Sequence, residues 1–258
     1  MDTNPKIKTD DEIEIHQYMT FEDMNLKDEL LRGIFSYGYE KPSSIQQRAI
    51  KQVIDGNDLI AQAQSGTGKT ATFTIGILQK LDIKKKATQV IILAHTRELA
   101  IQINEVVKHL SKYMEITTNL SVGGISVRDN INELNKNPHI VIGTPGRILD
   151  MLNKKALYND NIKLLIMDEA DELLSSIFIN QIYDIFRNLP GEIQVCLFSA
   201  TMNEYFFNIT KKFMRDPVKI LVKNEELTLD GISQYYINLE QNDHKFETLC
   251  DLYSAISV

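Results

Sequence analysis

Eight consecutive residues near the start of the chain have the composition of a loop that binds phosphate: Ala63-Gln64-Ser65-Gly66-Thr67-Gly68-Lys69-Thr70. Small residues let backbone N–H groups curve around an anion, and the N-terminus of a following helix adds partial positive charge. Lys69 would supply a cation for the phosphates, and Thr70 would offer a hydroxyl to Mg²⁺. A simple turn that caps a helix is less favoured, because strand, loop and helix follow one another in the order that phosphate binding requires.

A tetrad rich in acids, Asp168-Glu169-Ala170-Asp171, follows the apolar run Leu164 to Met167. An acid at the carboxyl end of a buried strand is placed to hold Mg²⁺, and a neighbouring carboxylate can orient water. Acids also favour helix N-termini through the helix dipole, so the tetrad alone is ambiguous. The presence of a phosphate-binding loop in the same chain favours the metal-binding interpretation.

Four more polar or glycine-rich turns each follow a different expected strand: Thr96 to Ala100, Gly123-Gly124, Thr144-Pro145-Gly146-Arg147 and Ser199-Ala200-Thr201. Taken singly, each has a plain explanation as a helix start, a tight turn or a helix cap. The carboxyl ends of parallel strands meet at one edge of a sheet, where ligands bind in open α/β folds. We therefore expect all of these turns to line one site together with Asp168.

Short apolar runs that alternate with helical patterns must position these residues. The expected strands are Leu59 to Ala63, Val90 to Ala94, Asn119 to Val122, Ile140 to Gly143, Leu164 to Met167, Val195 to Phe198 and Val218 to Val222. Most are apolar throughout, which is typical of a parallel sheet that helices cover on both faces. The alternation predicts an α/β fold with a doubly wound parallel sheet and right-handed crossovers.

Both ends of the chain depart from this pattern. Residues 1–20 are polar and acidic, and we expect a flexible extension before a domain at 21–222. Residues 223–233 are interpreted as a linker. In 234–258, Gln234 to Leu239 predicts a strand, and one helix face is marked by Phe246, Leu249, Leu252, Tyr253 and Ile256. One strand and one helix cannot bury these faces alone, so we expect this segment to begin a second domain.

Composition limits the class of protein. The chain has 258 residues, of which 43% are hydrophobic and 24% charged, which suits a folded core and not a disordered chain or coiled coil. No apolar stretch reaches the roughly 20 residues of a membrane span, and two isolated cysteines exclude a disulfide scaffold. We expect a soluble, intracellular protein. A formal net charge of −7 means that any contact with nucleic acid must be local.

The segment Pro42-Ser43-Ser44-Ile45-Gln46 has the spacing of a helix start. Ser43 and Gln46 match a capping box, and the helix that follows would have an apolar face of Ala49, Ile50, Val53 and Ile54 and would end at Gly56. On the residues alone, capping is the favoured role of Gln46.

With these motifs in this order, the chain from Phe21 onward resembles the DEAD-box RNA helicases, whose name spells the tetrad at 168–171. Within that family it is most similar to the translation-initiation branch, through the stretches Phe21 to Leu26, Pro42 to Ile50, Glu226 to Ile232 and Thr248 to Tyr253. An exon-junction branch shares most of these stretches, so the sequence leaves the two branches open.

The resemblance implies a RecA-like fold and a role for each matched residue. Gln46 would read the adenine edge as well as capping its helix, Phe21 would supply an aromatic surface near the base, and residues 63–70 would bind the phosphates of ATP. Asp168 would hold Mg²⁺ through water, Glu169 would position the attacking water, and Ser199 with Thr201 would link hydrolysis to domain closure. The residues similar to those that grip an RNA backbone are Thr96, Arg97, Gly124, Thr144, Gly146 and Arg147.

The implied activity is that of an ATP-dependent RNA helicase of the translation-initiation type, which couples ATP hydrolysis to local unwinding of RNA duplexes. A scaffold partner, a monomeric state and a cytoplasmic location are expected, or a nuclear location for the exon-junction branch. We expect one complete RecA-like domain and the start of a second, with the arginines that stabilise phosphoryl transfer beyond Val258, so that residues 1–258 alone are nearly inactive. An ATP-locked RNA clamp is the alternative. A P-loop ATPase that acts on DNA, or on no nucleic acid, is less favoured because it would give the turn at 144–147 no function.

The sequence also departs from the family pattern. His95 replaces the usual proline before Thr96, which leaves the backbone of an RNA-contacting turn less fixed. Ser176-Ile177 replaces a common Arg-Gly pair, and Asn203 replaces a common proline. No function is assigned to these last replacements, which we expect to lie away from the catalytic edge.

Overall fold

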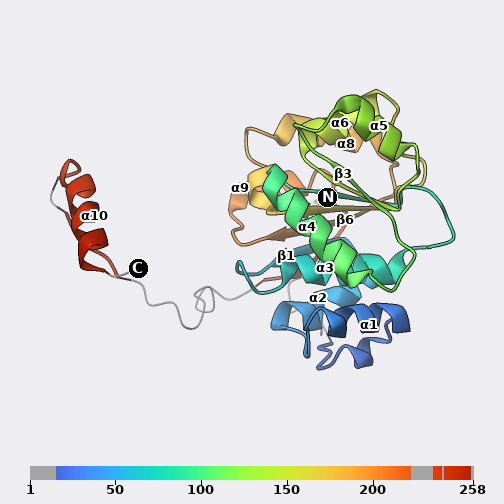
Figure 1. Ribbon diagram of the computed structural model, residues 1–258, viewed down its shortest axis with the longest axis horizontal. Helices are drawn as coiled ribbons and strands as arrows, with labels where there is room; N and C mark the ends of the chain where they lie inside the picture. Colours follow the sequence, from blue (N-terminus) through green and yellow to red (C-terminus); the bar gives the residue numbers. More distant parts are fainter. Residues whose placement is uncertain (1–15, 222–234, 240, 257–258) are drawn as a thin grey trace, which may run out of the picture. The chain divides into compact units, whose positions relative to one another are not determined.

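A parallel sheet of seven strands forms the centre of the larger unit in the computed structural model (Figure 1). The structure describes residues 16–221, 235–239 and 241–256. The chain divides into two units, 1–227 and 228–258, which are described separately. The expected linker at 223–233 and most of the expected N-terminal extension lie outside the described residues.

Each predicted strand of the larger unit is confirmed, with ends that shift by at most two residues. The strands are β1 (Leu59–Gln62), β2 (Val90–Leu93), β3 (Thr118–Ser121), β4 (Ile140–Gly143), β5 (Leu164–Asp168), β6 (Gln194–Ser199) and β7 (Val218–Ile220). They pair in the order β3-β4-β2-β5-β6-β1-β7, and every pair is parallel. This order confirms the doubly wound α/β fold.

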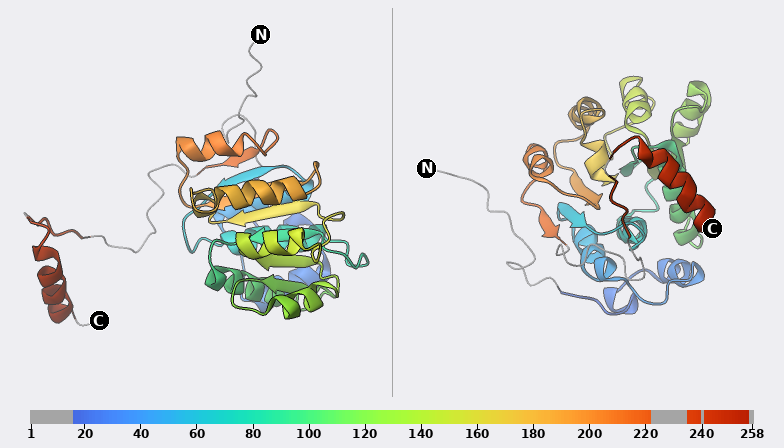
Figure 2. Two further views of the ribbon diagram at one scale, coloured as in Figure 1. Left: turned by 90° about the horizontal axis from the view of Figure 1, so that it is seen from above. Right: turned by 90° about the vertical axis from the view of Figure 1, so that its left-hand side faces the viewer.

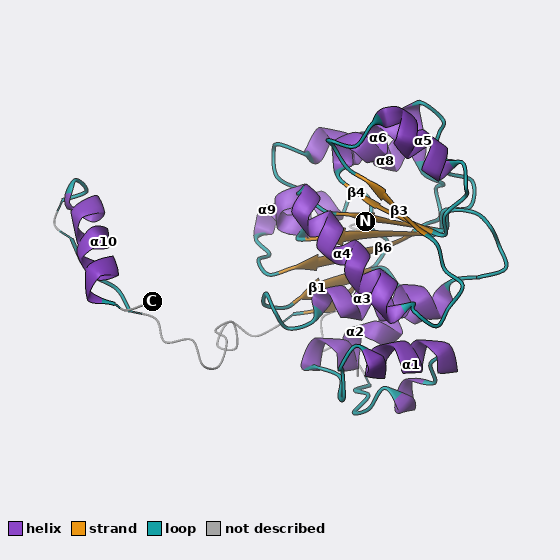
Figure 3. Ribbon diagram, viewed as in Figure 1, coloured by secondary structure: helices purple, strands orange, loops and turns teal. Residues whose placement is uncertain are grey.

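Helices cover both faces of the sheet (Figures 2 and 3). One layer contains the 3-10 helix η1 (Glu22–Met24) with α1 (Asp28–Ser36), α2 (Ser44–Asp55), α3 (Lys69–Lys80) and α4 (Arg97–Leu110). The other contains α5 (Val127–Leu134), α6 (Pro145–Asn153), α7 (Ala170–Leu173), α8 (Ile179–Asn188) and α9 (Glu204–Thr210). The expected helical face between residues 99 and 110 belongs to α4.

Side chains alternate along each strand between two hydrophobic cores. In β5, Leu164 and Ile166 pack with the α1–α4 layer, and Leu165 and Met167 pack with the α5–α9 layer. All four are buried, which explains why the strand is apolar throughout. The final residue of the strand, Asp168, is the first polar one, and it lies at the carboxyl edge of the sheet.

The N-terminal boundary of the larger unit lies earlier than the sequence predicted. The backbone N–H of Tyr18 donates a hydrogen bond to the carbonyl of Gln47 in α2, at 3.2 Å. The Tyr18 side chain also packs against the core, although it belongs to the segment that was expected to be a flexible extension. A backbone hydrogen bond and an apolar contact together anchor this short stretch.

In the smaller unit, the predicted strand is wrong for the residues that the structure describes. Residues 235–239 have no regular secondary structure, and Gln234 lies outside the described range. A strand must pair its backbone groups with a neighbour, and the described part of this unit contains no other strand. The predicted helix is confirmed as α10 (His244–Ala255), whose apolar residues Phe246 and Tyr253 are exposed. None of the helices in the described ranges has the length and apolar character of a membrane span.

The last residue of β4, Gly143, lies where β3 passes very close. A Cβ at this position would lie 2.1 Å from the backbone oxygen of Ser121. Because a paired backbone cannot move aside easily, we expect Gly143→Ala to lower the free energy of unfolding by about 1–3 kcal/mol. Urea unfolding followed by circular dichroism measures this change. Gly191→Ala, where a Cβ would meet no atom within 4 Å, is the control, and equal stability of the two variants would contradict the close approach.

Candidate functional site

The carboxyl ends of the strands form two adjacent groups along one edge of the sheet. Strands β5, β6 and β1 are neighbours and lead into Asp168, Ser199 and the loop at 63–68. Strands β3, β4 and β2 are neighbours on the other side and lead into Gly123-Gly124, Thr144 and Thr96. The two groups meet between β2 and β5. Sheet order thus gathers residues that are far apart in the sequence.

The loop at 63–70 has the backbone shape that its small residues predicted. Gly66 and Gly68 have φ angles of +83° and +93°, in the left-handed region that favours glycine. Lys69 begins α3, and its ammonium donates a hydrogen bond to the carbonyl of Ala63 at 2.6 Å. Burial lowers the pKa of Lys69, and the nearby carboxylates of Asp168, Glu169 and Asp171 oppose that effect. Lys69 is therefore a cation held over its own loop.

A direct contact joins this loop to the acidic tetrad. The hydroxyl of Thr70 donates to a carboxylate oxygen of Asp168 at 3.3 Å, and the other carboxylate oxygen accepts from the backbone N–H of Glu169 at 3.0 Å. Burial raises the pKa of Asp168 to about 6, although Lys69 acts in the opposite direction. Mg²⁺ prefers oxygen ligands, and the Thr70 hydroxyl and the Asp168 carboxylate lie side by side. These two residues therefore fit the expected ion.

The tetrad is also tied to the turns on either side of it. Glu169 has a φ of +50°, which is uncommon for a residue with a side chain, and its Oε2 lies 3.1 Å from Nδ1 of His95. Asp171 accepts a hydrogen bond from the hydroxyl of Thr201. The hydroxyl of Ser199 donates to the carbonyl of Thr201 at 2.7 Å. The tetrad therefore contacts the turn after β2 and the turn after β6.

Gln46 caps its helix, as its spacing with Ser43 predicted. Its side-chain oxygen accepts from the backbone N–H of Ser43 at 2.9 Å. Its side-chain nitrogen contacts the carbonyl of Gly68 at 3.4 Å, and the Ser43 hydroxyl donates to the carbonyl of Thr67 at 2.8 Å. These two contacts fasten the capping box to the phosphate-binding loop, which the sequence did not predict. The role of Gln46 toward adenine stays a prediction.

Phe21, which the family resemblance places near the base, lies inside the core of the larger unit. Its side chain is 0% exposed and belongs to the core of the α1–α4 layer, where it meets the ring of Phe35 edge to face at 6.4 Å. This packing anchors the N-terminal segment, and the role of Phe21 toward the base stays a prediction.

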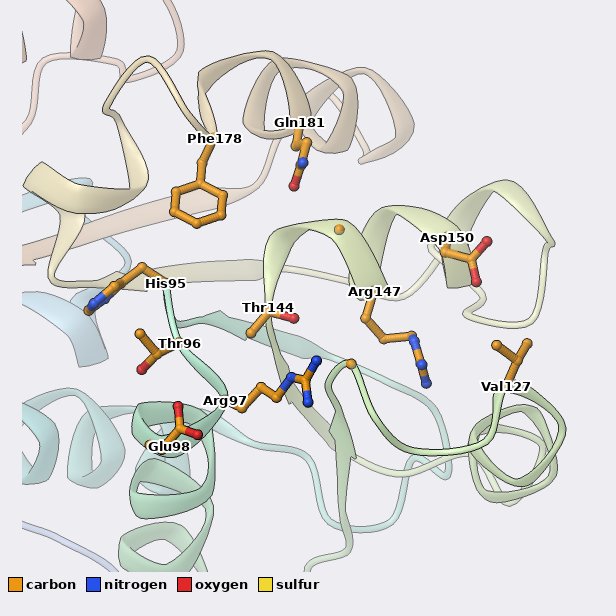
Figure 4. A pocket seen from close by; sticks show the side chains of 12 residues that line it. His95, Thr96, Arg97, Glu98, Val127, Thr144, Arg147, Asp150, Phe178 and Gln181 are labelled. Atoms are coloured by element: carbon orange, nitrogen blue, oxygen red, sulfur yellow. The ribbon is translucent and has the colours of Figure 1, made fainter.

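The turns after β2, β3 and β4 line a cavity of about 700 Å³ (Figure 4). Its lining residues are His95, Thr96, Arg97, Glu98, Gly123, Val127, Thr144, Gly146, Arg147, Asp150, Phe178 and Gln181. Five of the six residues expected to grip RNA are among them, and the sixth, Gly124, is the neighbour of Gly123. Gly124 has a φ of +87°, and a Cβ there would lie 2.7 Å from the Arg97 guanidinium. Glycine at this position allows the arginine to pack against the turn.

Several lining residues were missed by the sequence analysis. Phe178 and Gln181 lie at the start of α8 and face Thr144 across the cavity (Figure 4). They follow a short helix and not a strand end, so the reasoning from strand ends could not find them. The replaced pair Ser176-Ile177 directly precedes Phe178 in the sequence and is not among the residues that line the cavity. Asn203 has a structural role, because its side chain caps α9 by accepting from the N–H of Phe206 at 2.9 Å.

A model of the DEAD/DEAH box helicase family matches residues 43–208. The chain belongs to this family. It is 56% identical over 239 residues to the ATP-dependent RNA helicase eIF4A of Debaryomyces hansenii, which covers 93% of this chain and 60% of that relative. It is 53% identical over 260 residues to the ATP-dependent RNA helicase FAL1 of Saccharomyces cerevisiae, which covers 100% of this chain and 65% of that relative. The chain thus spans less than two thirds of the length of these helicases.

Solved structures of the family confirm the RecA-like fold. Saccharomyces cerevisiae Dbp5 bound to RNA and ADP BeF3 matches with a TM-score of 0.84 and 34% identity, over 92% of this chain and 60% of that one. A DEAD box protein from the hyperthermophile Methanococcus jannaschii matches with a TM-score of 0.77 and 36% identity, over 92% of this chain and 63% of that one.

The raised pKa of Asp168 has a consequence for stability. Its folded-state pKa of about 6 exceeds the ordinary value of 3.8, so the folded chain binds more protons than the unfolded chain between these values. Stability is then lost as the pH rises through this window. We expect Asp168→Asn to raise the free energy of unfolding by about 1–3 kcal/mol at about pH 8, without nucleotide or Mg²⁺, and by far less at about pH 4.

Urea unfolding at the two pH values measures this effect. The control is Asp184→Asn, because Asp184 is half-exposed and pairs with Arg187 on α8. If Asp168→Asn changes the free energy of unfolding equally at both pH values, the carboxyl of Asp168 does not have the raised pKa.

Gln46 can be tested for its two roles separately. Gln46→Ala removes the acceptor of the Ser43 N–H, so we expect a loss of about 1 kcal/mol in the free energy of unfolding. Because the family resemblance implies that the same side chain reads the adenine edge, we also expect a weaker preference for ATP over GTP, measured by competition with a fluorescent nucleotide. Asn203→Ala removes a cap from α9 and serves as the control. If both variants lose stability and both keep the preference for ATP, Gln46 is only a cap.

Proposed function

We propose that this chain is the nucleotide-binding and RNA-binding part of an ATP-dependent RNA helicase of the eIF4A translation-initiation type. The observation that carries the proposal is the contact between Thr70 and Asp168, at 3.3 Å, beside a cavity lined by Arg97 and Arg147. The names of the relatives support a helicase over the ATP-locked clamp. The proposal includes a cytoplasmic protein that is monomeric apart from a scaffold partner.

The nucleotide is held by the turns after β1, β5 and β6. Backbone N–H groups of the loop at 65–70 and the N-terminus of α3 favour the phosphates of ATP, and Lys69 exchanges the carbonyl of Ala63 for a phosphate oxygen. Thr70 and Asp168 would hold Mg²⁺, which would supply positive charge near the transferring phosphoryl group. Glu169 orients water for attack. Its strained backbone is fixed by the hydrogen bond that its N–H donates to the Asp168 carboxylate.

RNA is held by the turns after β2, β3 and β4. Arg97 and Arg147 supply charge for the phosphates, and both line the cavity (Figure 4). Thr96 and Thr144 begin α4 and α6, so their hydroxyls and the N–H groups of the first helical turns, including that of Gly146, face the same cavity. Such contacts bind the backbone and carry little information about base sequence.

The two halves of the site are joined by side-chain contacts. His95 lines the RNA cavity and lies 3.1 Å from Glu169, so movement of the turn after β2 acts on the residue that orients water. Thr201 and Asp171 make the corresponding link to the turn after β6. We propose that hydrolysis also needs arginines from a second RecA-like domain, since the matched helicases are longer than this chain. Residues 1–258 alone are then expected to bind ATP and to hydrolyse it very slowly.

Removal of Lys69 tests the nucleotide site. We expect Lys69→Ala to weaken binding of a fluorescent ATP analogue by about 100-fold or more in the presence of Mg²⁺, because a charge-assisted contact with phosphate is lost. Lys80→Ala is the control, since Lys80 is a partly buried lysine at the other end of α3 that donates to Gln194 at 2.6 Å. An ATP affinity that is unchanged in Lys69→Ala would remove the phosphate-binding assignment.

A further inference from the structure

The guanidinium of Arg147 is held in place by two uncharged oxygens. Nη2 donates to the carbonyl of Ile125 at 2.8 Å, and Nη1 donates to the side-chain oxygen of Asn130 at 3.2 Å. Among the described residues, no carboxylate lies within 4 Å of the Arg147 guanidinium, and the nearby Asp150 pairs with Lys154. Arg147 is therefore fixed at two points while it keeps its full positive charge.

Asn130 is itself rigidly held. Its side chain is buried, with 2% exposed, on the inner face of α5. Its side-chain nitrogen donates to the hydroxyl of Ser121 at 3.0 Å and to the side-chain oxygen of Asn119 at 3.2 Å, both on β3. The Ser121 hydroxyl completes the group by donating to Asn119 at 2.7 Å. This buried network links the edge strand to the RNA cavity.

Chemistry fixes which end of the Asn130 amide faces the arginine. A guanidinium has only donors, so it must meet the oxygen of Asn130, and the nitrogen must face the acceptors on β3. Two of the five N–H donors of Arg147 are used in these contacts, and the rest remain for a ligand. Arg147 itself lines the cavity (Figure 4).

We propose that Asn130 is a positioning residue for RNA, which orients Arg147 toward a backbone phosphate without neutralising it. The proposal rests on the assignment of this cavity to RNA. A carboxylate at the same place would hold the guanidinium more tightly, but it would cancel its charge and compete with phosphate. A smaller side chain would leave the guanidinium held only by the carbonyl of Ile125, and RNA binding would then have to restrict its rotamers further. The uncharged amide meets both requirements.

The test is binding of a labelled single-stranded RNA to the whole chain, measured by fluorescence anisotropy over a range of KCl concentrations. Each phosphate contact contributes about −0.7 to the slope of log affinity against log salt for a single strand. We expect Asn130→Asp to lose about tenfold in affinity and to lose about 0.7 of that slope, as Arg147→Ala does. We expect Asn130→Ala to lose about threefold in affinity and to keep the full slope, because Arg147 keeps its charge.

The controls separate positioning from folding. Asn104→Ala removes another buried asparagine, which accepts from Thr118 on β3 at 2.8 Å and has no contact with Arg147, so it should lower the melting temperature and leave RNA binding unchanged. Loss of RNA affinity in Asn104→Ala equal to that in Asn130→Ala would overturn the proposal. The proposal would also be overturned if Asn130→Asp kept the wild-type RNA affinity and salt slope while Arg147→Ala lost RNA affinity. Unchanged RNA binding in Arg147→Ala would instead overturn the assignment of the cavity to RNA, and this proposal with it.

Discussion

The site depends on the meeting of the phosphate-binding loop and an acid at one edge of the sheet. Asp168 ends β5 and Thr70 lies in the first turn of the helix after β1, and β6 lies between these two strands. Parallel pairing aligns the three strand ends, so that the Thr70 hydroxyl reaches the Asp168 carboxylate at 3.3 Å. Burial of this carboxylate disfavours its charged form, and a divalent cation there would restore it. The fold therefore carries an electrostatic cost at the point where the ion is needed.

Under the proposed function, the same sheet order allows the nucleotide and the RNA to influence one another. The two groups of turns meet at the pair β2 and β5, and His95 and Glu169 follow these strands directly or within two residues. The histidine side chain extends farther from the backbone than a proline ring, and Nδ1 of His95 lies 3.1 Å from the Glu169 carboxylate. The sequence indicated only that the backbone at His95 is less fixed. In the structure, the replacement also adds a polar contact between the halves.

The fold was largely predictable because most strands are buried on both faces and are therefore apolar runs. The residues that follow strand ends, such as Lys69, Asp168 and Thr144, were found for the same reason. Contacts between side chains of different elements could not be predicted, because the sequence separation of the two partners follows no period. Examples are Gln46 with Gly68 and Asn130 with Arg147. The strand expected at 234–239 failed because pairing depends on a neighbour and not on apolar content alone. The burial of Phe21 could not be predicted, because a resemblance gives a residue type and not its packing.

A double-mutant cycle at Thr70 and Asp168 tests the central claim most directly. The quantity is the gain in ATP affinity on adding Mg²⁺, measured by titration for the wild-type chain, Thr70→Ala, Asp168→Ala and the double variant. If both side chains hold one ion, each single change removes most of the gain, and the double change removes little more, which gives a coupling energy of about 1–3 kcal/mol. Independent, additive losses would show that the two side chains do not share an ion, and would contradict the site described here.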